Sequence, residues 1–338
     1  MAGPYAVHTP GGCSLRSVCY IRLMGRPAFR LVSRGGLAWV ESAPLAQWPW
    51  LVHAFSTRRG GVSRAPSEGL NLGLTKWDRP ADVEENRGRF LAQLGAEGMA
   101  SASVHQIHSA QSFVVARAAG QLTYRPPGVP GAGLSETVSP AGDALMTAET
   151  GILLTVRIAD CLPVLLVDPA TPAVAVVHAG WRGAVERVVE KAVGDLRRVF
   201  RSDPLQILAV LGPSIRACCY EVGEEVVAAF QGRFTRTERF FQPLSNSTQA
   251  AGDRPAIPFL STYPPGHAPE HVPAARLDLT AVAQEQLLCA GVSPSRILVA
   301  DWCTGCHTDL FFSHRKEGQR TGRQVAVIGI RPNSRPPN

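Results

Sequence analysis

A cysteine and a histidine lie at the ends of two neighbouring apolar segments, and both residue types can do chemistry. Cys161 precedes the run Leu162–Val167, and His178 follows the run Ala173–Val177. Asp, Thr and Pro residues between the runs favour a turn, so the two runs are predicted to form paired strands. Such pairing returns the chain to the end of the sheet from which the first strand departs, and it brings the thiol and the imidazole together. This pair predicts either part of a metal site or a nucleophile with its base.

Two upstream histidines are candidates for a third ligand. His105 and His108 lie in a segment predicted to be a strand, where alternation places them on opposite faces. Either could join Cys161 and His178. Three nitrogen or sulfur ligands with one open position are typical of a catalytic zinc centre. The spacing leaves the choice between the two histidines open.

Four other cysteines form two short motifs, Cys218-Cys219 and Cys303-Thr-Gly-Cys306. The second matches the spelling of a haem-attachment or redox motif, but the N-terminus lacks a secretory signal and no helix is predicted directly after the pair. Without a second CxxC, a four-cysteine zinc site is not expected. Adjacent Cys218 and Cys219 should point in different directions, so at most one is expected in a site. We therefore predict structural roles.

The composition indicates a soluble globular protein rather than a membrane or nucleic-acid-binding one. The chain has 338 residues, of which 45% are apolar and 18% charged, and a formal charge of +7. No apolar run approaches the roughly 20 residues of a membrane span. The positive charge is spread along the chain, which argues against nucleic-acid binding. Eight irregularly spaced cysteines predict reduced thiols and a cytoplasmic location.

Most of the chain is predicted to form one domain, residues 36–331. Residues 1–35 lack a persistent period and are expected to be a disordered extension or to precede the true start. A flexible insertion is expected at about 232–275, and Gly120–Gly142 is predicted to be a long loop. Helical periodicity predicts helices over Arg79–Leu94 and Ala184–Phe200.

Several motifs in a fixed order resemble the YfiH/laccase-domain family, also described as multicopper polyphenol oxidases and as purine nucleoside phosphorylases. The resemblance covers about residues 50 to 330. Its motifs are Phe55-Ser-Thr-Arg-x-Gly-Gly-Val-Ser63, Leu70-Asn-Leu-Gly73, Gln106-Ile107-His108, Ala159-Asp160-Cys161-Leu162-Pro163-Val164, His178-Ala-Gly-Trp-Arg-Gly183, Gly212-Pro-Ser-Ile-x-x-Cys218-Cys-Tyr-Glu-Val-Gly223, Phe312-Ser-His-Arg-x-x-Gly318 and Thr321-Gly-Arg323.

The resemblance implies an α+β fold: a single domain with four α/β/β/α layers and mixed β-sheets. It also implies that His108, Cys161 and His178 are the metal ligands and catalytic residues, which selects His108 over His105. The implied metal is zinc, with copper possible. None of this follows from local periodicity.

The activity implied by the resemblance is a zinc-dependent purine nucleoside phosphorylase acting on adenosine, inosine, guanosine and methylthioadenosine, together with adenosine deamination. A nucleoside and phosphate are then the partners. Arg59, Arg182 and Arg323 are candidate phosphate ligands, because a guanidinium grips two oxygens. Asn71 is a candidate contact of the base or ribose. Asp160 is expected to orient a histidine or to take a proton.

Three other functions use parts of the same pattern. A copper-dependent polyphenol oxidase is one, although the nine histidines include no His-x-His pair. A cysteine amidase that edits peptidoglycan precursors would use Cys161 as nucleophile and His178 as base. A non-enzymatic binding module is the third. The sequence leaves the preferred nucleoside, the pathway, the native metal and the oligomeric state open.

Overall fold

Two large mixed sheets form the centre of the protein. The computed structural model describes residues 28–129, 134–135, 139–244, 273–332 and 334. The first sheet has six strands in the order β1-β2-β3-β17-β9-β4. They are β1 (Phe29–Arg34), β2 (Leu37–Ser42), β3 (Leu51–Ser56), β17 (Gln324–Ile330), β9 (Ile152–Ile158) and β4 (Ala100–Ser103).

The second sheet has eight strands in the order β16-β12-β10-β11-β8-β5-β6-β7. Its strands are β16 (Ile297–Val299), β12 (Leu208–Leu211), β10 (Leu162–Asp168), β11 (Ala173–Ala179), β8 (Ala144–Thr147), β5 (Ser112–Ala118), β6 (Gln121–Arg125) and β7 (Leu134–Ser135). The predicted strand pair is confirmed: β10 and β11 are antiparallel, with Pro163 opposite His178.

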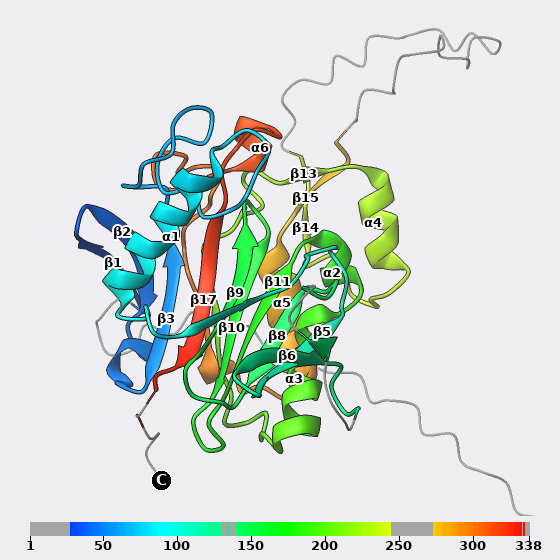
Figure 1. Ribbon diagram of the computed structural model, residues 1–338. Coiled ribbons are helices and arrows are strands. Elements are labelled where there is room, and N and C mark those ends of the chain that lie inside the picture. Colours follow the sequence, from blue (N-terminus) through cyan, green and yellow to red (C-terminus); the bar gives the residue numbers. More distant parts are fainter. Residues whose placement is uncertain (1–27, 130–133, 136–138, 245–272, 333, 335–338) are drawn as a thin grey trace, which may run out of the picture.

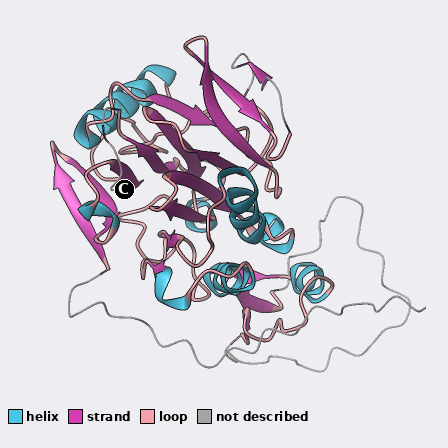
Figure 2. Cartoon of the chain, turned by 90° about the horizontal axis from the view of Figure 1, so that it is seen from below, coloured by secondary structure: helices cyan, strands magenta, loops and turns pink. Residues whose placement is uncertain are grey.

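Helices cover the outer faces of both sheets. Figure 1 shows α1 on one side of the strands and α2, α3 and α5 on the other, and Figure 2 shows the same arrangement from below. The α-helices are α1 (Pro80–Leu94), α2 (Trp181–Val185), α3 (Val188–Phe200), α4 (Glu224–Gln231), α5 (Leu279–Cys289) and α6 (His314–Glu317), and short 3-10 helices span Leu45–Gln47 and Pro294–Arg296. Within the described residues, none of the helices is long and apolar enough to cross a membrane.

Three apolar cores separate four layers. Alternate side chains of β10 and β11 point to opposite faces, so Leu165 packs against the first sheet while Leu166 packs under α3 and α5. A third core joins α1, through Phe90, to the outer face of the first sheet. The resulting order, helix, sheet, sheet, helix, confirms the single-domain α/β/β/α fold expected from the family resemblance.

The structure corrects the predicted boundaries of the domain. Residues 1–27 lie outside the described part of the chain, but β1 already begins at Phe29, whereas we expected little order up to residue 35. The insertion was expected at about 232–275, and this predicted start also lies too early in the chain. Phe234 and Phe240 pack in the core with α4, and β14 (Phe241–Gln242) pairs with β15 (Ala275–Leu277) beside β13 (Glu221–Val222). Of the residues in the expected insertion, only 245–272 lie outside the described part of the chain.

Two further predictions of secondary structure are wrong. Gly120–Gly142 is not one long loop, because β6 and β7 extend the edge of the second sheet. The helix expected over Ala184–Phe200 is interrupted between α2 and α3, where Arg187 adopts a left-handed conformation with φ of 60°. The buried Gln286 bonds the backbone on both sides of this break, accepting from Val189 N at 3.1 Å and donating to Ala184 O at 2.7 Å. A tertiary contact therefore stabilises a break that periodicity does not reveal.

Candidate metal centre

The β10–β11 hairpin positions two of the three predicted ligands. Cys161 lies directly before β10, and His178 lies near the end of β11. Because the strands are antiparallel, the pairing of Leu162 with Ala179 brings both ligands to one edge. The prediction made from the two apolar runs is confirmed.

His108 reaches the hairpin from a loop. Residues 104–111 form no strand, contrary to our prediction, and His108 has a left-handed backbone with φ of 59°. Asp143, at the start of β8, holds this loop with its carboxylate. It accepts from the backbone N–H of His108 at 3.0 Å and of Ser109 at 2.6 Å. Gln106 adds a second anchor by bonding the backbone of Arg157 in β9.

The three predicted ligands converge on one point. One nitrogen of His108, the sulfur of Cys161 and one nitrogen of His178 all lie within 4.8 Å of one another. Gly180 closes the space behind them: a Cβ there would lie 2.7 Å from Cδ2 of His108 and 3.0 Å from Sγ of Cys161. Only glycine lets the chain pass this close. We call this group, His108, Cys161 and His178, the His-Cys-His site.

Asp143 also determines which nitrogen of His178 faces the site. Its Oδ1 lies 2.8 Å from Nδ1 of His178, and both side chains are buried. A carboxylate at this position fixes the ring and its tautomer, leaving Nε2 as the ligand atom. Burial disfavours the charge on Asp143, but the hydrogen bonds from His178 and Ser109 outweigh it and lower the pKa of this carboxyl.

The surroundings of Cys161 and His178 favour the charged form of each side chain. Burial alone would raise the pKa of Cys161, but the charge of His178 and hydrogen bonds with both histidines lower it to about 6. Burial also opposes charge on His178, whereas Cys161 and Asp143 raise the pKa of this imidazole to about 9. The thiolate form is the one that binds metals. A metal ion would compete with the proton on His178.

This donor set fits a transition-metal ion. A zinc ion with bonds of about 2.0–2.3 Å to nitrogen and sulfur requires ligand atoms about 3.5 Å apart, a spacing that these side chains can reach. His108 is exposed and Cys161 is half-buried, so the fourth position faces solvent. The residues can therefore hold one ion with an open position.

Sequence reasoning missed Asp143 and assigned its role to Asp160. The carboxylate of Asp160 instead accepts from Oγ1 of Thr304 at 2.6 Å and from the backbone N–H of Arg315 at 2.7 Å, which connects the residue before Cys161 to the loop after β16 and to α6. The available signal for Asp143 was an aspartate directly before an apolar segment. No local pattern connected it to His178, which lies 35 positions later.

Comparison with known proteins identifies the family. The sequence profile described as "Multi-copper polyphenol oxidoreductase laccase" matches residues 52–331. The chain belongs to this family. A Deinococcus radiodurans protein named "Purine nucleoside phosphorylase" is 35% identical over 291 residues, covering 85% of this chain and 93% of its relative. "Adenosine deaminase RL5", from an unknown prokaryotic organism, is 32% identical over 279 residues, covering 82% and 93%.

Solved structures of the family share the fold. The structure of YlmD from Geobacillus stearothermophilus aligns with a TM-score of 0.69 and 31% identity, covering 90% of this chain and 99% of its own. The Bacillus licheniformis hypothetical protein YfiH aligns with a TM-score of 0.71 and 26% identity, covering 89% and 99%. These alignments agree with the four layers described above.

The structure separates the family-motif residues that we expected to contact substrate. Asn71 is fully buried, and its side chain bonds Gly73, Asp78 and the backbone N–H of Arg323, so it holds loops together, and its contact with the base or ribose stays a prediction. Arg59 is half-exposed and forms an ion pair with Asp309 at 2.8 Å.

Two other arginines share the electrostatic environment of the His-Cys-His site. The charge of Arg323 interacts with those of Cys161 and Asp160. Arg182, in α2, lies over the ring of Trp181 at 4.3 Å. Burial has the largest effect on the pKa of Tyr220, which the charge of Cys161 also raises and that of Arg182 lowers. Arg182 and Arg323 thus remain candidates for phosphate binding, together with Arg315, which sequence analysis did not single out and which lies over Tyr220.

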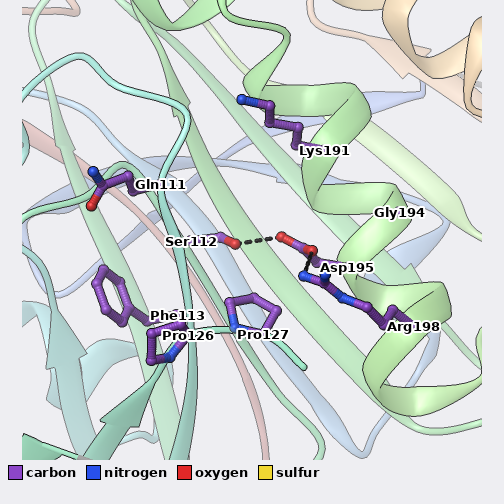
Figure 3. A pocket seen from close by; sticks show the side chains of 9 residues that line it. All are labelled: Gln111, Ser112, Phe113, Pro126, Pro127, Lys191, Gly194, Asp195 and Arg198. Atoms are coloured by element: carbon purple, nitrogen blue, oxygen red, sulfur yellow. Dashed lines mark hydrogen bonds and ion pairs between the residues drawn. The ribbon is translucent and has the colours of Figure 1, made fainter. Parts of the chain in front are cut away.

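A separate cavity of about 660 Å³ lies between β5 and α3. Figure 3 shows that three of its polar side chains interact: Ser112 donates to Asp195, which also pairs with Arg198. None of the predicted site residues lines it. The cavity is therefore distinct from the His-Cys-His site.

Proposed function

We propose that this protein is a zinc-dependent purine nucleoside phosphorylase that also deaminates adenosine. The substrates of the phosphorolysis are adenosine, inosine, guanosine and methylthioadenosine. The observation that carries the proposal is the convergence of two histidines and one cysteine, with Asp143 buried behind His178. The names of the relatives from Deinococcus radiodurans and of RL5 support the two reactions.

Phosphorolysis requires an anion-binding group and stabilisation of a departing base. A phosphate oxygen forms a bond to the anomeric carbon while the bond to the purine breaks, and the purine keeps the electron pair. Positive groups placed where negative charge develops stabilise this transition state. Arg182 and Arg323 are the side chains that we assign to phosphate, because a guanidinium binds two oxygens at once.

Deamination requires activated water beside the purine. A zinc ion with three protein ligands and an open position supplies Lewis acidity and lowers the pKa of water to about 7. The protein holds the ligands: Asp143 orients His178, and the loop bonded by Asp143 presents His108.

The cysteine amidase is the second candidate, because a sulfur of Cys161 within 4.8 Å of a ring nitrogen of His178 has the composition of a nucleophile with its base. A nucleophile pair has no need of His108, whose nitrogen lies within 4.8 Å of the other two ligand atoms. A copper-dependent oxidase uses the same ligands with a different ion. Metal identity distinguishes all three.

One experiment separates these activities. The purified chain is analysed for bound metal and incubated with adenosine in the presence and absence of phosphate. Ribose 1-phosphate that forms only with phosphate supports phosphorolysis, and inosine that forms without phosphate supports deamination. A fully zinc-loaded protein with no turnover of any of the four nucleosides would overturn the proposal. Phenol oxidation that follows copper loading would favour the oxidase.

Variants of the His-Cys-His site test the ligands independently of activity. His108→Ala, Cys161→Ala and His178→Ala should each lower the affinity of this site for zinc. His105→Ala is the matched control, because His105 is exposed on the same loop and bonds Pro140 and Gly142 through its backbone. Zinc affinity unchanged in all three ligand variants would contradict the assignment.

A further inference from the structure

Four cysteines come together at a second place. Cys218 and Cys219 lie between β12 and β13, and Cys303 and Cys306 lie after β16. Their four sulfurs lie within 4.8 Å of one another, and Sγ of Cys306 is 3.4 Å from each of the other pair. This corrects our prediction that no four-cysteine group forms and that at most one of the adjacent cysteines joins a site. We call these residues the four-cysteine cluster.

The sheet topology explains why the two cysteine motifs meet. β12 and β16 are parallel neighbours, so the loops that follow them leave the same edge of the second sheet. The loops stay paired beyond the strands, because Ser214 and Cys303 form a bridge and Thr304 N donates to Ser214 O at 3.0 Å. A CxxC turn and a Cys-Cys pair are thus held face to face.

The spacing of the sulfurs suits a single tetrahedral ion. Zinc–sulfur bonds of about 2.3 Å place four tetrahedral sulfurs about 3.8 Å apart. The four sulfurs here all lie within 4.8 Å of one another, and Sγ of Cys306 is 3.4 Å from that of Cys218 and of Cys219, so small side-chain rotations suffice. All four are free thiols. Four thiolates in this geometry select zinc or iron over harder cations.

A backbone donor and a lysine lie beside the cluster. The backbone N–H of Arg216 donates to Sγ of Cys303 at 3.4 Å. Gly305 lies against Cys219, where a Cβ would approach Cβ of that cysteine to 2.9 Å, so glycine allows the turn to close. Lys316 is also near this turn and can balance negative charge. Donors and cations around the ligands are a regular feature of metal sites.

We propose that the four-cysteine cluster binds a second zinc ion, which holds the loops after β12 and β16 together. The cluster connects to the His-Cys-His site through Thr304, which lies between the two cysteines of the CxxC motif and bonds Asp160. Asp160 has a left-handed backbone with φ of 88° and precedes the ligand Cys161. The second ion therefore supports the backbone from which Cys161 projects.

Zinc stoichiometry tests this proposal, which does not depend on the proposed function. Metal-stripped, reduced full-length protein is titrated with zinc alone. The wild type should bind two ions per chain, Cys218→Ser/Cys306→Ser one, His108→Ala/His178→Ala one, and the combined variant none. Cys289→Ser, a change of an exposed cysteine on α5 outside both groups, should bind two. Failure of the nucleoside assays would leave these numbers unchanged.

Cobalt absorption provides a second readout, which is independent of zinc counting. Cobalt-loaded wild type should show the intense thiolate-to-cobalt absorption of a four-sulfur site, and His108→Ala/His178→Ala should retain it. Cys218 and Cys306 are both exposed, so Cys218→Ser/Cys306→Ser should fold. Its melting temperature is expected to lie several degrees below that of the wild type. One zinc per wild-type chain with no change in Cys218→Ser/Cys306→Ser would overturn the proposal. So would a disulfide between Cys306 and either Cys218 or Cys219 in the reduced preparation.

Discussion

The carboxylate of Asp143 lies 2.8 Å from Nδ1 of His178 while it also accepts from the backbone N–H of His108. One buried side chain therefore holds two of the three predicted ligands of the His-Cys-His site. It orients one ring directly and the other through the loop that carries it. The geometry of the site depends on Asp143 as much as on the ligands themselves.

Replacing Asp143 should weaken metal binding. Asp143→Asn keeps the size of the side chain but removes the charge, and an amide cannot accept all of the donors that the carboxylate accepts. We expect the zinc affinity of the His-Cys-His site to fall by about 10–100-fold. Chelator competition measures this change. Asp195→Asn, which alters an aspartate bonded to Ser112 beside the cavity of Figure 3, should leave the affinity unchanged. Equal affinities in the two variants would contradict this role.

The space behind the ligands is a second test. Gly180 has φ of −76°, which alanine also adopts, so only the close approach of His108 and Cys161 opposes a methyl group. Gly180→Ala should therefore impair zinc binding at this site while the protein still folds. In Gly194→Ala, within α3, the new methyl group meets open space, and the unfolding free energy should rise by about 0.5–1 kcal/mol. Zinc titration and denaturant unfolding of both variants check these outcomes.

Arginine variants test the location of phosphate. A charged hydrogen bond is worth about 1.5–3 kcal/mol, so Arg182→Ala or Arg323→Ala should raise the KM for phosphate by roughly 10–150-fold. Arg198→Ala, in the separate cavity, should not change it. Steady-state kinetics with varied phosphate measures each value. A comparable rise in Arg59→Ala alone would instead place the anion in the loop that carries the ion pair of Arg59 with Asp309.

The bond between Thr304 and Asp160 predicts a loss of stability. Thr304→Val keeps the shape but leaves the carboxylate without its 2.6 Å donor, so we expect the unfolding free energy to fall by about 1.5–3 kcal/mol. Thr280→Val is the matched control, because the buried hydroxyl of Thr280 has no hydrogen-bond partner in the described part of the chain. Its loss should be neutral or stabilising. Denaturant unfolding of both variants decides the matter, and equal losses would refute the role of Thr304.

His53 should make the fold sensitive to acid. Burial lowers the pKa of His53 from 6.5 to about 4, and its Nε2 accepts from the backbone N–H of Ser42. The unfolded chain therefore binds a proton, between pH 6.5 and about 4, that the folded protein excludes. Stability that is present above pH 6.5 is lost as the pH falls, by about 1.4 kcal/mol for each pKa unit.

The control for this effect is His53→Gln, whose amide oxygen can accept from Ser42 without gaining a charge. Other groups titrate alike in both proteins, so the difference between their unfolding free energies isolates His53. We expect the wild type to lose about 3 kcal/mol more than the variant between neutral pH and about pH 4. Parallel pH profiles would show that His53 is protonated in the fold.

Local sequence patterns determined the hairpin and its two ligands. Apolar runs on either side of a turn can pair only antiparallel, so Cys161 and His178 had to meet. The amphipathic helix near residues 80–94 was also readable, because its period is local. The third ligand needed the family resemblance, since a loop with a left-handed residue carries no period.

Only the tertiary structure decided the rest. Asp143 reaches His178 because β8 and β11 pair, and the four-cysteine cluster forms because β12 and β16 are parallel neighbours. Such pairings join residues far apart along the chain, and no short-range pattern encodes them. Asn71 and Arg59 both lie in family motifs, but the motifs did not reveal their structural surroundings. Asn71 is buried, and Arg59 forms an ion pair with Asp309. The sequence by itself supplied the chemical groups and one hairpin, and long-range strand order decided which groups came together.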